Sequence, residues 1–170
     1  MSPRLVIVGP PGAGKTTVGE LLALRWGVPF ADSDQLAERR SGRSVADMFV
    51  LDGEATFRAL ERDVVAEALT SHDGVLALGG GAILDESTRA RLAEHPVILL
   101  TAGASVAAAR VGLNRDRPLL LGNVRGQLLA LLNERAEFYA EVATWTVATD
   151  DAEPDAIADM IEALVSGEQA

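Results

Sequence analysis

A glycine-rich loop near the start of the chain constrains the fold more than any other feature. Residues 9–17 read Gly-Pro-Pro-Gly-Ala-Gly-Lys-Thr-Thr and match the phosphate-binding pattern G-x-x-x-x-G-K-[ST]. The short apolar run Leu5–Val8 precedes the loop and is typical of a strand buried on both faces. Thr16–Trp26 follows it with apolar residues at helical spacing. This strand–loop–helix order favours a phosphate site over a plain Gly/Pro turn and predicts an α/β fold.

The residue types in this loop suit bound phosphate groups. Gly12 and Gly14 permit positive φ angles, so backbone N–H groups can turn toward phosphate oxygens beside the positive end of a helix. Lys15 is the only lysine in the chain and supplies a compact charge for the β- and γ-phosphates. The Thr16 hydroxyl is a candidate Mg²⁺ ligand. The loop residues expected to hold the phosphates of a nucleotide are Gly12, Ala13, Gly14, Lys15, Thr16 and Thr17.

Composition and charge limit the range of partners. The 170 residues are enough for one domain with a buried core and a cleft. A formal net charge of -10 disfavours nucleic acid or an anionic membrane as the partner, so an anionic ligand must meet a local group of cations. Cysteine is absent, and no apolar run has the length of a signal peptide core or a membrane span. We therefore expect a cytoplasmic monomer that acts on small molecules.

Apolar runs alternate with helical patterns along the rest of the chain. Further strands are expected at residues 29–31, 75–78, 96–100 and 145–147. Further helices are expected at residues 43–51, 54–69, 85–93, 106–111, 125–140 and 154–165. This alternation predicts a parallel sheet with helices on both faces and ligands beyond the carboxyl ends of its strands. The phosphate loop, residues 32–34 and residues 79–81 should then face one cleft.

Two acids follow the second expected strand. On an extended chain, Asp32 and Asp34 would point the same way, since they are two residues apart. Asp32 would then serve a Mg²⁺ shared with Thr16, directly or through water, and Asp34 would engage a substrate hydroxyl. The alternative is that one or both cap a helix that begins near Gln35, a common role for aspartate.

Two arginines are candidates for binding a carboxylate. Arg58 precedes Glu61 by three residues on an expected helix, a spacing that lets the acid hold the guanidinium in place. A fixed guanidinium can grip a carboxylate through two parallel hydrogen bonds. Arg135 lies on the long helix at 125–140, beside Glu134 and Glu137. For both arginines an ordinary surface ion pair is the alternative.

Two loops would complete the cleft. Gly79, Gly80 and Gly81 follow a buried strand and permit close approach of the backbone to a ligand. The polar loop at 114–118 contains Arg117, which as part of a mobile cover would bring a cation to a transferring phosphoryl group. The alternative for the three glycines is a plain turn, and the alternative for the loop at 114–118 is a solvated basic loop.

Seven segments, in order along most of the chain, resemble the shikimate kinases. They are GPPGAGKTT at 9–17, DSD at 32–34, RSVADMF at 43–49, GEATFRALE at 53–61, LGGGA at 78–82, RDRPLL at 115–120 and ERAEFYAEVA at 134–143. The resemblance implies a single nucleoside-monophosphate-kinase-like domain of strand order 2-3-1-4-5, with residues 33–61 binding the substrate and residues 112–123 forming a lid. It also implies ATP-dependent phosphorylation of the 3-hydroxyl of shikimate, on the way to chorismate and the aromatic amino acids.

The resemblance also assigns roles by position. On the nucleotide side, Lys15 and Arg117 would contact the phosphates, Arg110 would lie near the nucleotide, and Thr16 and Asp32 would serve Mg²⁺. The residues implied for shikimate are Asp34, Arg58, Gly79, Gly80, Gly81 and Arg135, with Phe49 and Phe57 as walls of the pocket. The residues implied for catalysis are Lys15, Asp34 and Arg117.

One segment departs from the family pattern. The loop before the last helix, where the family packs adenine with polar and often basic residues, reads Asp-Asp-Ala-Glu-Pro at 150–154. Three acids at this place leave nucleotide affinity and base preference open.

Two other functions compete with the one that the resemblance implies. The first is a kinase of the same fold that acts on another polyol acid, such as gluconate. The second is an ATP-binding module or switch without turnover.

Overall fold

The computed structural model describes residues 1–111 and 123–167, which contain a five-stranded sheet. All of its strand pairs are parallel and the order is β2-β3-β1-β4-β5, so the predicted topology is confirmed. The strands are β1 (Leu5–Val8), β2 (Phe30–Asp32), β3 (Val75–Ala77), β4 (Val97–Thr101) and β5 (Trp145–Ala148). Because β1 is central, the loop that follows it opens at the middle of the carboxyl edge of the sheet.

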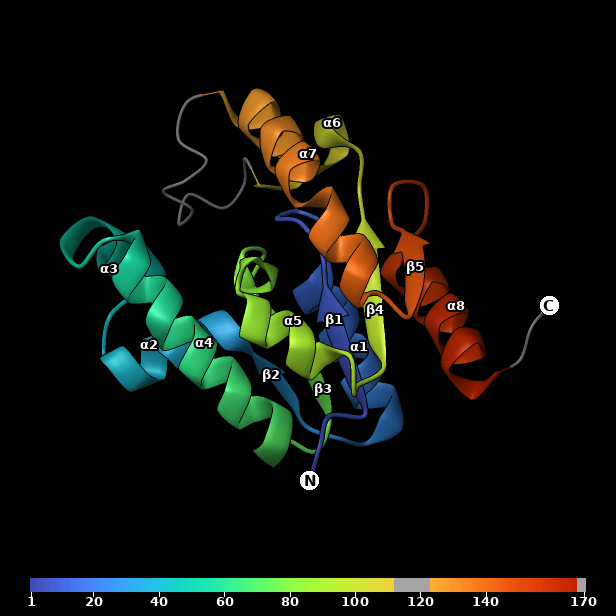
Figure 1. The fold of residues 1–170 in the computed structure, drawn as a ribbon. Helices are drawn as coiled ribbons and strands as arrows, with labels where there is room; N and C mark the ends of the chain where they lie inside the picture. Colours follow the sequence, from blue (N-terminus) through green and yellow to red (C-terminus); the bar gives the residue numbers. More distant parts are fainter. Residues whose placement is uncertain (112–122, 168–170) are drawn as a thin grey trace.

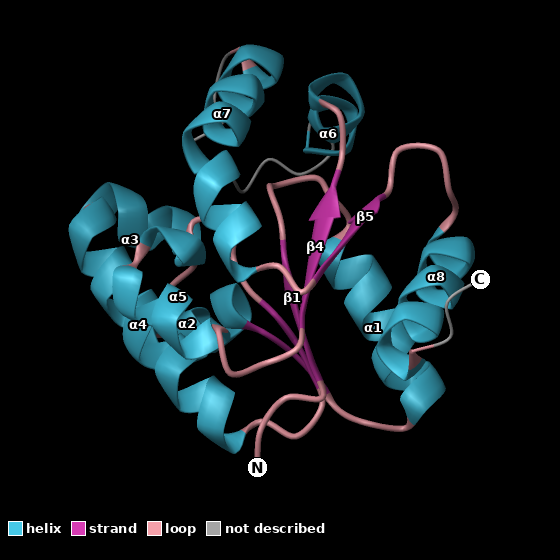
Figure 2. Cartoon of the chain, turned by 45° about the vertical axis from the view of Figure 1, so that its right-hand side comes forward, coloured by secondary structure: helices cyan, strands magenta, loops and turns pink. Residues whose placement is uncertain are grey.

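Helices cover both faces of the sheet, with α1 and α8 on one face and α4, α5 and α7 on the other (Figures 1 and 2). The helices are α1 (Lys15–Trp26), α2 (Ser33–Ser41), α3 (Val45–Leu51), α4 (Glu54–Ser71), α5 (Glu86–Leu92), α6 (Ala104–Val111), α7 (Val124–Val142) and α8 (Pro154–Ser166), with a 3-10 turn, η1 (Ala82–Leu84). None of the helices in the described ranges is long and apolar enough to cross a membrane.

The side chains of β1 alternate between two cores. Leu5 and Ile7 pack with residues of α1 and α8, whereas Val6 and Val8 pack with residues of α4, α5 and α7. All four are buried, as expected for the central strand of a parallel sheet covered on both sides. Burial on both faces holds the end of β1, and hence the loop that leaves it, in a fixed place.

A smaller core lies outside the sheet, where α2 and α3 pack against α4. Its buried members are Ala37, Met48, Phe57 and Val64. These helices lie together beside β2 (Figure 1). The expected substrate-binding segment, residues 33–61, therefore contributes a helical unit of its own.

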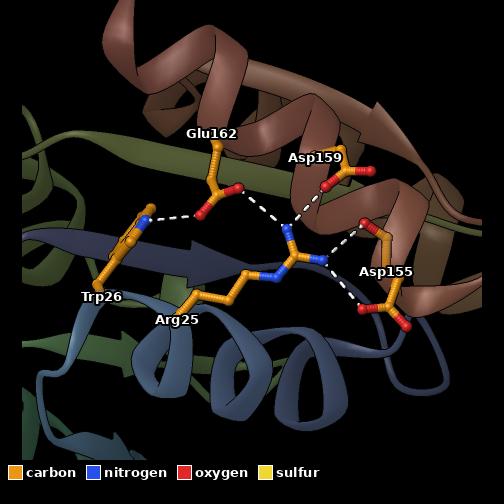
Figure 3. Close-up of polar contacts among 5 residues, drawn as sticks. All are labelled: Arg25, Trp26, Asp155, Asp159 and Glu162. Atoms are coloured by element: carbon orange, nitrogen blue, oxygen red, sulfur yellow. Dashed lines mark hydrogen bonds and ion pairs between the residues drawn. The ribbon is translucent and has the colours of Figure 1, made fainter.

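Arg25 joins α1 to α8 (Figure 3). Its guanidinium donates to carboxylate oxygens of Asp155 at 2.9 Å, Asp159 at 2.7 Å and Glu162 at 3.0 Å. Glu162 also accepts from the indole N–H of Trp26 at 3.0 Å. The hydrogen bonds to Asp159 and Asp155 raise the pKa of Arg25 above its usual range. This cluster fastens α8, from Asp155 to Glu162, to the end of α1.

Residues 32–34 correct one expectation from the sequence. β2 ends at Asp32 and α2 begins at Ser33, so Asp34 lies in the first turn of a helix. The prediction that Asp32 and Asp34 project side by side from an extended chain is therefore wrong. The Asp32 carboxylate accepts a hydrogen bond from the Asp34 N–H at 2.9 Å, so for Asp32 the capping alternative is confirmed.

Candidate active site

The phosphate loop has the shape that its glycines predicted. Gly12 and Gly14 have φ angles of 82° and 93°, and Gly14 is the left-handed N-cap residue of α1. Gly12 also packs against α6, because a Cβ there would lie 2.7 Å from the carbonyl oxygen of Ala107. The loop thus ends at the amino end of α1, where N–H groups without helical partners are available to an anion.

Lys15 lies at the first position of α1 and is largely buried. Its Nζ donates to the carbonyl oxygens of Gly9 at 2.8 Å and Pro10 at 3.1 Å. The ammonium group is therefore held against the loop on which it stands, where it can meet a phosphate bound by the same loop.

Thr16 and Asp32 meet at the carboxyl ends of β1 and β2. The Thr16 hydroxyl donates to Oδ2 of Asp32 at 3.2 Å, while the other carboxylate oxygen caps α2. A hydroxyl and a carboxylate are the hard oxygen donors that Mg²⁺ prefers. The described residues contain no group of three or more His, Asp or Glu placed to hold a metal ion by themselves. A two-ligand site suits Mg²⁺, which keeps several waters and uses few protein ligands.

Polar side chains from three helices converge on the backbone of residues 79–81. A Cβ at Gly81 would overlap the guanidinium of Arg58, and a Cβ at Gly79 would lie 2.5 Å from Oδ1 of Asp34. At Gly80 a Cβ would lie 3.5 Å from a guanidinium nitrogen of Arg135. The predicted acceptor residues are therefore brought together, and the triple glycine leaves the room that their side chains occupy.

Arg58 is held on α4 by a buried acid, as its spacing predicted. Its guanidinium donates to Oε1 of Glu61 at 2.9 Å, and the Glu61 side chain is only 4% exposed. The aromatic rings of Phe49 and Phe57 lie 5.7 Å and 5.4 Å from the guanidinium carbon. Arg58 also lies 3.5 Å from the exposed carboxylate of Glu54, but its shorter ion pair is with the buried Glu61, so it is more than a surface ion pair.

Burial raises the pKa of Glu61 to about 7. The charge and hydrogen bond of Arg58 oppose this rise, as does the charge of Arg135, while the neighbouring carboxylate of Asp34 adds to it. The acceptor side of the site thus contains two arginines and two acids in a poorly solvated space. The protonation of Glu61 there depends on the charges of its neighbours.

Helix α7 contributes Arg135 and, one turn later, Tyr139. Arg135 is 4% exposed, so it is not a surface residue. The Tyr139 hydroxyl donates to the carbonyl oxygen of Gly80 at 2.8 Å, and burial raises the pKa of Tyr139 to about 12. Sequence reasoning did not identify Tyr139, although its i,i+4 spacing from Arg135 places both on one helix face.

A cavity of about 610 Å³ lies between the phosphate loop with α1 and the β5–α8 loop. Its lining residues are Ala13, Gly14, Thr17, Val18, Arg110, Thr149, Asp150, Asp151, Ala152, Glu153, Pro154 and Ile157. Arg110 reaches it from α6, near the place predicted for a nucleotide. The carboxylate of Asp150 accepts from the Gly103 N–H at 2.9 Å and 3.0 Å, so one of the three acids in this loop ties it to the β4–α6 turn.

Arg117 and residues 112–122 of the expected lid lie outside the described residues.

The fold and the site define a P-loop phosphotransferase whose acceptor side carries two buried or half-buried arginines. The family model described as shikimate kinase matches residues 11–165. The chain belongs to the shikimate kinase family, whose members are kinases.

The sequences and a solved structure of known shikimate kinases match nearly the whole chain. The shikimate kinase of Thermobifida fusca is 58% identical over 94% of this chain and 92% of its own length, and that of Saccharopolyspora erythraea is 54% identical over 100% and 98%. A solved shikimate kinase from Acinetobacter baumannii, in complex with shikimate, has a TM-score of 0.93 and 35% identity, covering 99% of this chain and 95% of that one.

Proposed function

We propose that this chain transfers the γ-phosphoryl group of ATP to the 3-hydroxyl of shikimate, giving shikimate 3-phosphate and ADP. One observation carries the proposal: the phosphate side and the acceptor side meet at Gly80. A Cβ at Gly80 would lie 3.0 Å from Pro11 of the phosphate loop and 3.5 Å from the guanidinium of Arg135. A phosphate bound to the loop and a carboxylate bound to the arginines would therefore belong to adjacent ligands in one cleft.

On the donor side, backbone N–H groups of residues 12–17 and the ammonium of Lys15 bind the phosphates of ATP. Thr16 and Asp32 hold Mg²⁺, which when bound neutralises phosphate charge. Arg110 lies at the nucleotide, and we assign Arg117 and the lid at 112–123, of which only residue 123 is among the described residues, to the phosphoryl group. This side lowers the barrier by fixing positive charge where the transferring group develops negative charge.

On the acceptor side, Arg58 and Arg135 bind the shikimate carboxylate. Both side chains are largely removed from water, and the Nε atom of each is buried without a hydrogen-bond partner among the described residues. Guanidinium groups with little water around them bind a carboxylate through strong, charge-assisted hydrogen bonds. The backbone of residues 79–81 supports the ring, and Asp34 orients the attacking hydroxyl.

The reaction relies on positioning and charge neutralisation more than on proton removal. Phosphoryl transfer has a loose transition state in most analyses, so the attacking hydroxyl needs little help from a base. Asp34 lies next to the Glu61 carboxylate and the backbone of Gly79 in a crowded space. Its main contribution is to hold the hydroxyl in line with the γ-phosphate, and it takes up the proton as the new bond forms.

The test is ADP release from purified protein with MgATP and shikimate, compared with shikimate omitted. Gluconate replaces shikimate in a parallel reaction, and Lys15→Met is the control for contaminating ATPases. We expect shikimate-dependent ADP that the variant and gluconate do not give. ADP release with gluconate instead would establish the other kinase, and ATP binding with no turnover would establish the binding module.

We further propose a single domain that acts as a cytoplasmic monomer on small molecules, with residues 33–61 as its substrate-binding segment. The formal net charge of -10 opposes contacts with nucleic acid and with anionic membranes, which supports this view. Light scattering coupled to gel filtration measures the mass directly. A species with twice the chain mass of 17.9 kDa would overturn the monomer.

A further inference from the structure

Thr149, directly after β5, is a buried polar residue with no part in the roles described above. It is 0% exposed, and its hydroxyl lies 2.8 Å from the carbonyl oxygen of Ala13 and 3.1 Å from that of Thr101. A hydroxyl has one proton to donate, and the shorter distance assigns it to Ala13. The end of the last strand is thereby bonded to the phosphate loop.

Arg110 contributes the other half of this connection. Its Nη1 donates to the Thr149 hydroxyl at 3.0 Å and to the carbonyl oxygen of Gly12 at 2.9 Å. Its Nη2 donates to the carbonyl oxygen of Thr149 at 2.9 Å. Thr149 and Arg110 therefore hold two consecutive carbonyl groups of the phosphate loop, those of Gly12 and Ala13.

The bond to Ala13 controls the direction of a neighbouring N–H group. The carbonyl of Ala13 and the N–H of Gly14 belong to one peptide group, and in a trans peptide they point in opposite directions. No cis peptide bond occurs among the described residues. The Gly14 N–H therefore points away from Thr149, at the amino end of α1 where phosphate binding is expected.

The orientation of the Ala13–Gly14 peptide group depends on a contact from outside the phosphate loop. Gly12 and Gly14 flank Ala13, both have positive φ angles, and glycine rotates more freely than other residues. The Thr149 hydroxyl supplies such a contact from a rigid place, because the Thr149 N–H continues the pairing of β5 with β4 through a 2.8 Å bond to Thr101. The sheet thus fixes the orientation of the loop through one side chain.

We propose that Thr149 is a positioning residue for ATP, whose hydroxyl holds the Ala13–Gly14 peptide so that the Gly14 N–H faces a phosphate oxygen. This inference rests on the proposed ATP site. Thr149 acts through the loop and not on the transferring phosphoryl group. Its removal should therefore weaken nucleotide binding while leaving shikimate binding, which uses α2, α4, α7 and residues 79–81, nearly unchanged.

Three matched variants test the proposal. Thr149→Val keeps the branched shape and removes the hydroxyl, whereas Thr149→Ser keeps the hydroxyl and removes a methyl group. Thr146→Val is the control, because it makes the same threonine-to-valine substitution at an exposed position of β5. Loss of one buried hydrogen bond should raise the KM for ATP of Thr149→Val about five- to tenfold. Its KM for shikimate should stay within about twofold of the parent value, and the other two variants should resemble the parent chain.

Calorimetric titration with ADP alone gives a second readout that requires no turnover, and the Kd should follow the same pattern. Any one of three results would overturn the proposal. The KM for ATP could be unchanged in Thr149→Val, the KM values for ATP and shikimate could rise equally in that variant, or Thr149→Ser could raise the KM for ATP as much as Thr149→Val does. If Thr149→Val does not fold, Thr149→Cys is compared with Thr149→Ser. These two side chains differ in one atom, a sulfur that hydrogen-bonds weakly in cysteine and an oxygen that hydrogen-bonds strongly in serine. Failure of the parent chain to turn over shikimate would refute the proposed function instead, without affecting the ADP comparison.

Discussion

The buried carboxyl of Glu61 should make this protein lose stability as the pH rises, which is the reverse of the usual effect of a carboxyl group. The perturbation is Glu61→Gln, which keeps the shape and an oxygen that can accept from Arg58 but removes the titrating group. Charged groups face this position from three helices: Arg58 on α4, Arg135 on α7 and Asp34 on α2. The variant therefore isolates the titration of one side chain in a crowded site.

The sign follows from the two pKa values. Burial raises the pKa of Glu61 from 4.5 to about 7, so over this range the folded chain keeps a proton that the unfolded chain has released. The stabilisation is complete below the unfolded value and is lost as the pH rises through the folded value. Between about pH 5.5 and about pH 8.5 the parent chain should lose about 2 kcal/mol relative to Glu61→Gln.

Urea unfolding of both proteins at several pH values in this range measures the difference directly, and the range avoids the isoelectric point near 4.6. Glu54→Gln is the matched control, because Glu54 lies 3.5 Å from the same guanidinium but its side chain is 53% exposed. The difference between parent and control should be independent of pH. A pH-independent difference between the parent and Glu61→Gln would refute the argument from burial.

Three further predictions concern the contacts around the site and between the helices. Arg58→Ala should raise the KM for shikimate about 10- to 100-fold and that for ATP much less, because a charged hydrogen-bond pair to the carboxylate is lost; equal effects in steady-state kinetics would indicate a merely structural arginine. Tyr139→Phe should lower the free energy of unfolding by about 1 kcal/mol, since the Gly80 carbonyl loses its 2.8 Å partner; an unchanged urea midpoint would contradict that bond. Arg25→Ala should lower Tm at low salt by leaving three clustered carboxylates without their shared cation, and the loss should shrink as salt is added; a loss that salt does not change would argue against an ionic origin.

Local segments were the most predictable part of this protein. The β1–loop–α1 unit could be expected because the glycines, Lys15 and the flanking apolar residues all act within about 20 residues of one another. The Arg58–Glu61 pair could be expected for the same reason, since helical spacing alone brings the two side chains together. Segment 33–41 was harder, because its sequence is strongly polar and lacks a clear apolar period.

Contacts between distant segments could not be inferred in this way. The bond from Tyr139 to Gly80 joins residues 59 apart in the chain, and that from Thr149 to Ala13 joins residues 136 apart. Neither residue type is diagnostic by itself, since buried tyrosines and threonines usually serve packing or satisfy backbone groups. Only the way the sheet and helices pack reveals which backbone groups these hydroxyls reach.

The sequence by itself determined the chemistry of this protein: a phosphate loop with a single lysine, two acids after a strand, two arginines on helices, and a triple glycine. It determined these because each depends on residue type and short spacing. The tertiary structure decided that Arg135 is buried, that both sides of the cleft meet at Gly80, and that Thr149 holds the phosphate loop. These depend on contacts between elements far apart in the chain, which form only when the sheet has buried both of its faces.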